Sequence, residues 1–278
     1  MTFQHVGLLT NHQKELASQT HKNVLAWLEK QPLKVSVLDF NQSSSLDDVD
    51  LVIAIGGDGT MLHAARLVAP KNIPLVGINR GYLGFLADIA PDDFETSLTA
   101  ILKQETKKEE RILLNAQLVK NDVVIYELVA LNDVVLKHEN SARMMHFSTS
   151  INGDYVNTHY GDGLIIATPT GSTAYALSCG GPIIEPGIPA ISLTPICPHT
   201  LSDRPLIVPT SSNIELKLEE RAESGMVSVD GEDLGRLERD MRLLISVASA
   251  KLTLLHPPEH SYYKMLRGKL HWGRDQSR

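Results

Sequence analysis

The residues best suited to chemistry are those of the GGDGT segment at residues 56–60, which follows an apolar run at residues 50–55. In an open α/β sheet, ligands bind where a strand ends and the next helix begins. The glycines let the backbone approach a ligand closely and aim amide N–H groups at it, and a helix N-terminus favours a phosphate. A carboxylate repels a phosphate, so Asp58 needs a role of its own.

Two roles of Asp58 are compatible with a neighbouring phosphate. It binds the cation that accompanies a nucleoside triphosphate, or it takes the proton of an attacking hydroxyl group, and both roles point to phosphoryl transfer. The alternative is a tight strand-to-helix turn in which Asp58 caps Thr60 and the following residue. The segment taken alone leaves both interpretations open.

A second group of polar residues lies further along the chain. Gly161-Asp162-Gly163 precedes an apolar run at residues 164–167, which leads into the sequence TPTGSTAY at residues 168–175. Small hydroxyl-bearing residues can hydrogen-bond a ribose or an amide while the ring of Tyr175 stacks on a base. Asn132-Asp133 offers an adjacent amide and carboxylate that suit a ribose diol, and the alternative is an Asx turn.

The first hundred residues predict an α/β domain with a mostly parallel, Rossmann-like sheet that positions the GGDGT segment. After Asp50, the run at 50–55 is continuously apolar, which is typical of a strand buried on both faces. Pro91 suits the first position of a helix. Strands are expected at residues 6–9, 35–39, 50–55 and 74–78, and helices at 11–29, 60–68 and 91–104.

A charged run at residues 103–111 marks a change from helical spacing to two-residue alternation. The chain beyond it predicts a β-rich, sandwich-like domain, with its clearest hairpin turn at Asn152-Gly153. Helical spacing returns at residues 260–270, which we expect to pack on the first domain. The predicted organisation is an α/β nucleotide-binding domain at 1–104, a β-rich domain at 105–258 and a returning helix at 259–278.

Composition excludes several classes of protein. The formal net charge is −7, which disfavours a nucleic-acid-binding protein. The only cysteines are Cys179 and Cys197, so neither a disulfide framework nor a structural zinc site is indicated, and a reducing compartment fits best. No stretch is long and apolar enough for a membrane span, and we expect a cytoplasmic protein without a membrane partner.

The motifs together resemble those of the bacterial ATP-dependent NAD kinases. The matching stretches are GGDGT at 56–60, ALND at 130–133, GDGLIIATPTGSTAYALSCGGPI at 161–183 and PHTLSDRPLIVP at 198–209. The resemblance implies transfer of the ATP γ-phosphoryl group to the 2′-hydroxyl of NAD, with ATP and NAD as substrates and Mg²⁺ bound with ATP rather than in a protein cage. It also implies a homo-oligomer, either a dimer or a tetramer.

The resemblance assigns roles to individual residues. Asp58 would be the base. The residues near the ATP phosphates would be Gly56, Gly57, Gly59 and Thr60, with His63 on the following helix as a further candidate. Residues that would hold the hydroxyl groups, adenine and nicotinamide of NAD are Asn132, Asp133, Asp162, Thr170, Thr173, Ala174, Tyr175 and Ser178.

Two positions depart from the family pattern. Many relatives have Glu where this chain has Asp133, and several bacterial relatives have Arg near Tyr160, a further candidate for binding NAD. Two alternatives of other classes remain: a lipid kinase of the diacylglycerol or sphingosine kinase type, and a non-catalytic NAD-binding regulator. The hydroxyl-rich loop favours a nucleotide over a lipid, and Asp58 favours catalysis over binding alone.

Overall fold

The computed structural model describes residues 3–11, 15–39, 46–81, 84–138, 144–200, 202–219 and 224–272. The chain divides into two compact units. The first contains residues 1–110 and 252–278, and the second contains residues 111–251. The boundaries expected from the sequence, after residues 104 and 258, lie a few residues from these divisions.

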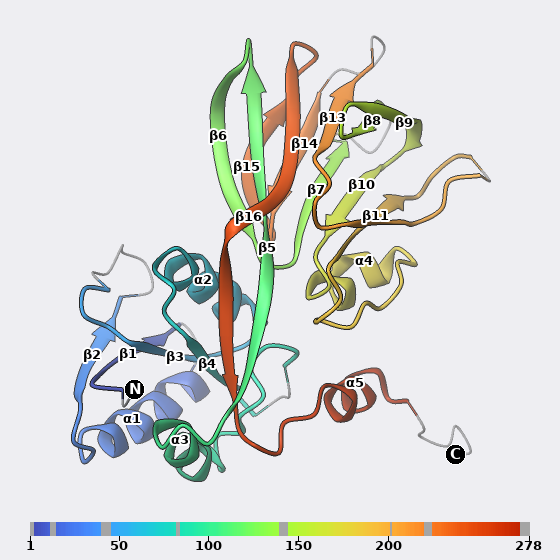
Figure 1. Ribbon diagram of the computed structural model, residues 1–278. Helices are drawn as coiled ribbons and strands as arrows, with labels where there is room; N and C mark the ends of the chain where they lie inside the picture. The colour runs from blue at the N-terminus through green and yellow to red at the C-terminus, as the bar shows by residue number, and fades with distance from the viewer. Residues whose placement is uncertain are drawn as a thin grey trace. The chain divides into compact units, whose positions relative to one another are not determined.

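The first unit is built on a parallel sheet with the strand order β2-β1-β3-β4 (Figure 1). The end of β16 joins this sheet beside β4, through Leu254 and Leu75. Every residue of β3 is buried, which agrees with its continuous apolar sequence. The strands are β1 (His5–Thr10), β2 (Lys34–Leu38), β3 (Leu51–Ile55) and β4 (Leu75–Ile78).

Helices cover both faces of this sheet. In Figure 1, α1 (Glu15–Leu28) and α3 (Phe94–Leu102) lie on one face, and α2 (Asp58–Val68) lies on the other. The rings of Trp27 and Phe94 meet edge to face, with centroids 6.1 Å apart, and join α1 to α3. A short 3₁₀ turn, η1 (Ala69–Lys71), follows α2. The predicted α/β architecture of this unit is therefore confirmed.

Helix α3 differs from its prediction. Its N-cap is Asp93, whose N–H donates to the carbonyl of Ala90, so residues 91–93 form a turn before the helix. The prediction that Pro91 occupies the first helical position is therefore wrong.

The second unit consists of two antiparallel sheets. One sheet has the strand order β12-β11-β10-β7-β14-β15. The other has the order β16-β13-β8-β9 within this unit. Strand β5 pairs with β6 in the same sheet. The six-stranded sheet contains β7 (Asp133–His138), β10 (Gly163–Ala167), β11 (Ala190–Ile196), β12 (Leu206–Pro209), β14 (Gly225–Val229) and β15 (Glu232–Leu237). The other strands are β5 (Lys107–Lys120), β6 (Val123–Ala130), β8 (Met145–Ile151), β9 (Asp154–Gly161), β13 (Ile214–Leu218) and β16 (Met241–His256).

Alternating side chains of the two sheets form one core, as expected for a sandwich. Phe147 and Leu216 come from one sheet, and Leu136 and Ile166 from the other. The turn at Asn152-Gly153 has φ values of 53° and 88°, as a two-residue hairpin requires, so that prediction is confirmed.

Two strands, β5 and β16, carry the chain from one unit into the other. Strand β5 begins at Lys107, so the charged run at 103–111 is partly strand rather than linker. After β16, helix α5 (Tyr262–Leu270) belongs to the first unit and buries Met265 and Leu266. The expected return of the C-terminal segment is confirmed. Among the described residues, no helix is both long enough and apolar enough to cross a membrane.

Candidate functional site

Asp58 is the first residue of α2, directly after the turn that ends β3, and Gly57 is the N-cap. Its carboxylate accepts hydrogen bonds from the backbone N–H groups of Phe85 (3.4 Å) and Leu86 (3.1 Å). Gly84 packs closely there, since a Cβ atom on it would lie 2.6 Å from Asp58 Oδ1. The alternative in which Asp58 caps the start of its own helix is therefore wrong: the carboxylate is held by a different segment of the chain.

The glycines of the turn are not equivalent. A Cβ atom on Gly56 would lie 2.2 Å from Thr60 Oγ1, and one on Gly57 would lie 3.2 Å from Arg80 Nη2. A Cβ atom on Gly59 would meet nothing within 4 Å. Gly56 is thus required for packing, whereas a Cβ on Gly57 would meet only the end of the flexible Arg80 side chain, and Gly59 lies in open space. His63 lies one turn further along α2, on the helix that the sequence predicted.

Arg80 and Asn79 are site candidates that the sequence reasoning missed. Both follow β4, whose carboxyl end lies beside that of β3 because the two strands are parallel neighbours. Asn79 Oδ1 accepts the N–H of Gly81 at 2.7 Å, and Arg80 puts a guanidinium group beside the glycine turn. The signal was available, since an Asn-Arg-Gly sequence follows an apolar strand at the edge where ligands bind.

In the second unit, Asp230 organises the backbone around Asn132 and Asp133. Its carboxylate accepts the N–H groups of Leu131 (2.8 Å), Asn132 (2.8 Å) and Asp133 (3.1 Å). Burial of Asp133, together with the nearby charge of Asp230, raises the pKa of the Asp133 carboxyl to about 7. Asp230 has a φ of 50°, which is typical of a turn residue, and its contact with the turn at Asn132 is one that local sequence does not indicate.

The loop that follows β10 packs directly on this turn. Thr168 donates its backbone N–H to the carbonyl of Asn132 at 2.9 Å and its hydroxyl to the carbonyl of Leu131 at 2.5 Å. A Cβ atom on Gly171 would lie only 2.1 Å from the Asn132 carbonyl oxygen. The structure therefore brings the ALND and TPTGSTAY segments together.

The hydroxyl groups of this loop have different partners. Ser172 is fully buried and donates to the Pro169 carbonyl at 2.6 Å, which gives it a structural role. Thr173 donates to the Thr170 carbonyl at 3.2 Å. The Thr170 hydroxyl accepts from Arg111 Nη1 at 3.2 Å, and Arg111 is a buried cation that the sequence reasoning missed.

Tyr175 begins α4 (Tyr175–Ser178) after the 3₁₀ turn η2 (Gly171–Thr173), and Ala174 is the N-cap of α4. Tyr175 and Ser178 are both exposed and share a helix face at a spacing of three residues. Burial of part of the ring, the nearby Cys179 and Cys197 thiols and the charge of Asp162 raise the pKa of Tyr175.

Tyr160 lies on β9, where its ring stacks on His146 with centroids 4.2 Å apart. Its carbonyl accepts the N–H of His199 at 2.8 Å. The ring is 44% exposed, so it can contact a ligand, although it supplies no positive charge. The Asp162 carboxylate lies 3.5 Å from His138 Nε2.

Comparisons with known proteins identify the family. The ATP-NAD kinase N-terminal domain matches residues 37–106, and the ATP-NAD kinase C-terminal domain matches residues 131–256. The chain is 46% identical to an NAD kinase of Halorhodospira halophila over 249 residues, which is 88% of this chain and 79% of the relative. It is 39% identical to an NAD kinase of Nitrosospira multiformis, with 98% of this chain and 96% of the relative covered.

Solved structures give the same result. A yeast NADH kinase complexed with NADH has a TM-score of 0.89 at 26% identity, over 99% of this chain and 89% of the yeast chain. An Archaeoglobus fulgidus NAD kinase in complex with ATP has a TM-score of 0.77 at 25% identity, over 96% of this chain and 98% of that one. The chain belongs to the ATP-NAD kinase family.

Proposed function

We propose that the protein transfers the γ-phosphoryl group of ATP to the adenosine 2′-hydroxyl of NAD, giving NADP and ADP. The observation that carries this proposal is the Asp58 carboxylate, fixed by two backbone amides at the carboxyl end of β3 and the N-terminus of α2. The names of the relatives and the ATP and NADH complexes of the two solved structures support the same reaction.

In the proposed step, the 2′-oxygen of NAD attacks the γ-phosphorus of ATP. The new O–P bond forms while the bond between the γ-phosphorus and the bridging oxygen breaks, and ADP leaves with that electron pair. Asp58 accepts the proton of the attacking hydroxyl. The amides of Phe85 and Leu86 hold the carboxylate at one position, so that little reorganisation precedes proton transfer.

The ATP phosphates are proposed to lie at the N-terminus of α2, where helix N–H groups and the helix dipole stabilise anions. Arg80, next to Gly57, adds a positive charge that can stabilise the transferred group. The remaining residues in this role are Gly56, Gly59, Thr60 and His63.

On the NAD side, Asn132 and Asp133 are proposed to bind ribose hydroxyls. With its pKa near 7, Asp133 either donates or accepts a hydrogen bond around neutral pH. The exposed Tyr175 ring is proposed to stack on a base of NAD. The other proposed contacts are Tyr160, Asp162, Thr170, Thr173, Ala174 and Ser178.

Mg²⁺ is proposed to enter with ATP, bound mainly by phosphate oxygens. Each Asp58 oxygen accepts one amide hydrogen bond, so the carboxylate retains lone pairs of the hard-oxygen type that Mg²⁺ prefers, directly or through water. The ion would neutralise charge on the phosphates.

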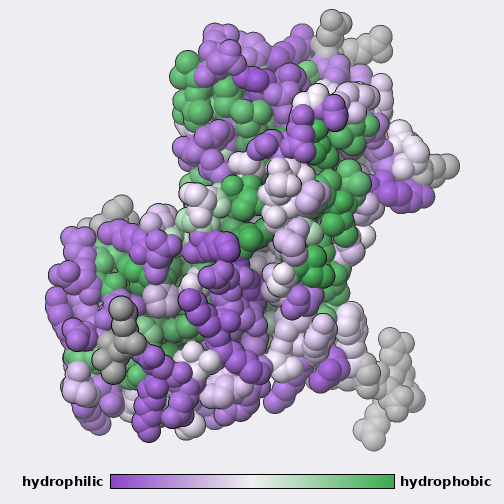
Figure 2. Space-filling model, viewed as in Figure 1, coloured by the Kyte–Doolittle hydropathy of each residue, from purple (hydrophilic) through white to green (hydrophobic). Residues whose placement is uncertain are grey.

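A homo-oligomer is proposed because β6 is an edge strand that pairs only with β5 among the described strands. Figure 2 shows hydrophobic surface over β6. This strand carries four exposed aliphatic or aromatic side chains: Val123, Val124, Ile125 and Tyr126. Such an edge favours association with another copy of the chain. Sedimentation velocity tests this, and we expect a dimer or a tetramer. A cytoplasmic location is also proposed, supported by the free thiols of Cys179 and Cys197.

The function is tested with purified protein, ATP and Mg²⁺, by detecting NADP with an NADP-specific dehydrogenase. Parallel reactions contain NADH, diacylglycerol or sphingosine in place of NAD, and polyphosphate in place of ATP. We expect NADP in an amount equal to the ADP formed, and no lipid phosphate. NAD binding without any product would instead favour a non-catalytic binding protein, and lipid phosphorylation would favour the lipid kinase alternative.

A further inference from the structure

Four ionisable side chains of the first unit form a cluster that the proposed reaction does not use. Asp88 follows β4, Glu109 lies in β5, His256 ends β16, and His260 precedes α5. Asp88 Oδ2 lies 3.0 Å from His256 Nδ1 and 2.5 Å from His260 Nδ1. On the opposite edge of the rings, His256 Nε2 and His260 Nε2 lie 3.7 Å and 3.6 Å from Glu109 oxygens.

The hydrogen-bonding capacity of the two rings does not match these surroundings. Four ring nitrogens face carboxylates, but a neutral imidazole has one N–H group and one lone pair. Both Nε2 atoms and Asp88 Oδ1 are buried and make no hydrogen bond. Protonating both rings would stack two cations with centroids 3.9 Å apart. A cation bound on the Nδ1 side would make each Nε2 an N–H donor, which the neighbouring Glu109 oxygens can accept.

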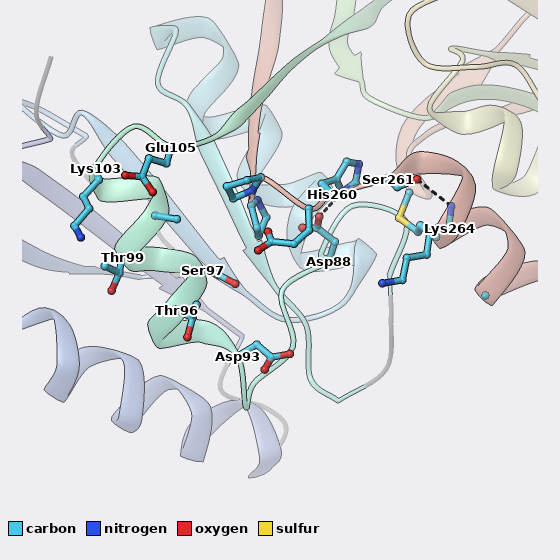
Figure 3. Close-up of a pocket in the computed structure, with 16 residues that line it drawn as sticks. Asp88, Asp93, Thr96, Ser97, Thr99, Lys103, Glu105, His260, Ser261 and Lys264 are labelled. Atoms are coloured by element: carbon cyan, nitrogen blue, oxygen red, sulfur yellow. Dashed lines mark hydrogen bonds and ion pairs between the residues drawn. The ribbon is translucent and has the colours of Figure 1, made fainter.

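A pocket of about 910 Å³ gives access to the cluster, and Asp88 and His260 form part of its wall (Figure 3). Helix α3 and the segment around His260 supply most of the other lining residues. Acidic groups outnumber basic ones in this lining: Asp88, Asp93, Glu105 and Glu259 against Lys103 and Lys264. A cavity with excess negative charge concentrates cations.

We propose that His256, His260 and Asp88 bind a zinc ion. Single ligand atoms of the three residues lie within 4.8 Å of one another, and both Nδ1 atoms converge on one oxygen of Asp88. The ion takes the two Nδ1 lone pairs and the Asp88 carboxylate, with water from the pocket as the fourth ligand. Each Nε2–H then donates to Glu109, as in carboxylate–histidine–metal arrangements.

Small movements suffice to form this site. Ligand atoms around tetrahedral zinc are about 3.3 Å apart, so Asp88 withdraws by less than about 1 Å from the two rings. The rings are stacked with an interplanar angle of 21°, so convergence of both lone pairs on one ion requires one ring to turn about χ2. This torsion is soft for histidine. The imidazole ligands favour Zn²⁺ over Mg²⁺, which prefers oxygen.

The ion would connect the C-terminal segment, through His256 and His260, to the loop that binds the Asp58 carboxylate. Asp88 follows Phe85 and Leu86, whose amides bind the Asp58 carboxylate, by only a few residues. Lys107 Nζ donates to the His260 carbonyl at 2.5 Å and holds the same segment from β5. Zinc therefore has a stabilising role at this point of the first unit.

The test is calorimetric titration of Zn²⁺ into protein that has been treated with EDTA, dialysed and kept free of nucleotide. We expect one Zn²⁺ per chain. His256→Gln and His260→Gln should each weaken binding by at least about 100-fold, and Glu109→Gln by about 10-fold or more. His271→Asn, which removes an exposed imidazole at a left-handed position that Asn tolerates, should not change it.

Two further measurements distinguish zinc binding at this site from binding by the cysteines, and a loss of binding from a loss of folding. Bound Co²⁺ should show d–d bands without thiolate charge transfer, and a Cys179→Ser/Cys197→Ser variant should bind Zn²⁺ unchanged. Circular dichroism shows whether each variant is folded. If His256→Gln does not fold, the zinc affinities of His260→Gln and Glu109→Gln test the proposal. Absence of stoichiometric binding by the wild type, or binding kept by His260→Gln and lost in the cysteine variant, overturns the proposal.

Discussion

At the scale of single residues, Asp133, buried beside Asp230, gives the clearest prediction of how stability depends on pH. The raised pKa of Asp133, about 7, means that the folded protein holds a proton that the unfolded chain releases near the ordinary value of 3.8. Between these two values the native state binds more protons, so a rise in pH removes stability. The stabilising contribution of the protonated Asp133 carboxyl to the free energy of unfolding is fully present below about pH 4. It is lost as the pH rises through 7.

Asp133→Asn replaces this carboxyl with an uncharged group of similar shape. We expect the free energy of unfolding of the variant, relative to that of the wild type, to rise by at least about 1 kcal/mol between pH 5 and pH 8. Urea unfolding at both pH values measures this difference. Asp154→Asn, at an exposed position of the same unit, is the control. A difference that does not change with pH contradicts the ionisation argument.

Tyr175 tests the NAD side. Tyr175→Ala should weaken NAD binding by about 1–3 kcal/mol, because the base loses its stacking partner, while Tyr175→Phe should keep most of the affinity. Tyr155→Ala, which removes a 66% exposed ring from β9, serves as the matched control. Calorimetric titration with NAD measures all three variants, and an unchanged dissociation constant for Tyr175→Ala removes that ring from the site.

Local sequence is enough to single out Asp58 and the loop around Tyr175 as site candidates, because each follows an apolar run. It could not predict Asp230, which binds Asn132 from 98 residues away. Arg111 reaches Thr170 over 59 residues. Side chains that act over such separations leave no local sequence pattern. Arg80 differs, because it belongs to an Asn-Arg-Gly sequence that directly follows an apolar strand.

At the scale of elements, the glycine turn between β3 and α2 makes a prediction with an internal control. Gly56→Ala should lower the thermal midpoint clearly, because its Cβ would lie 2.2 Å from Thr60 Oγ1. Gly59→Ala should leave the midpoint unchanged or raise it, since the position is open and alanine favours a helix by up to about 1 kcal/mol. Scanning calorimetry compares them, and equal losses of stability would contradict the packing described for the turn.

Elements with a strong periodicity or a continuous apolar run were predictable, as β1 and β3 demonstrate. The break between β6 and β7 was indicated only by the Asx turn considered at Asn132-Asp133, because residues 123–136 contain no glycine or proline. The chain turns there because Asp230 binds three successive amides. The start of α3 was misplaced because the Pro91 signal competed with a turn ending at Asp93.

At the scale of the whole molecule, the first unit is discontinuous in sequence, and its last helix should contribute to its stability. Leu266→Ala on α5 should cost about 2–5 kcal/mol, as is usual for a fully buried leucine. Tyr263→Ala, at a position 60% exposed on the same helix, should cost less than about 0.5 kcal/mol. Urea unfolding measures both, and similar costs would contradict the packing of α5.

Alternating strands and helices predicted the α/β class of the first half, and two-residue alternation predicted the β-rich second half, because periodicity records which faces are buried. It did not predict that β5 and β16 each continue from one unit into the other, since a strand's partners lie far away in sequence. The spacing of His256 and His260 was visible, but their juxtaposition with Asp88 depends on the return of the C-terminal segment.

The most direct test of the central claim is the rate of NADP formation by wild type and Asp58→Asn, with NAD affinity measured on the same preparations. Loss of a general base should lower turnover by at least about 100-fold, while the NAD dissociation constant should stay within about tenfold. Asp92→Asn, at an exposed position of the first unit, should behave as wild type. Turnover by Asp58→Asn close to that of wild type would contradict the account.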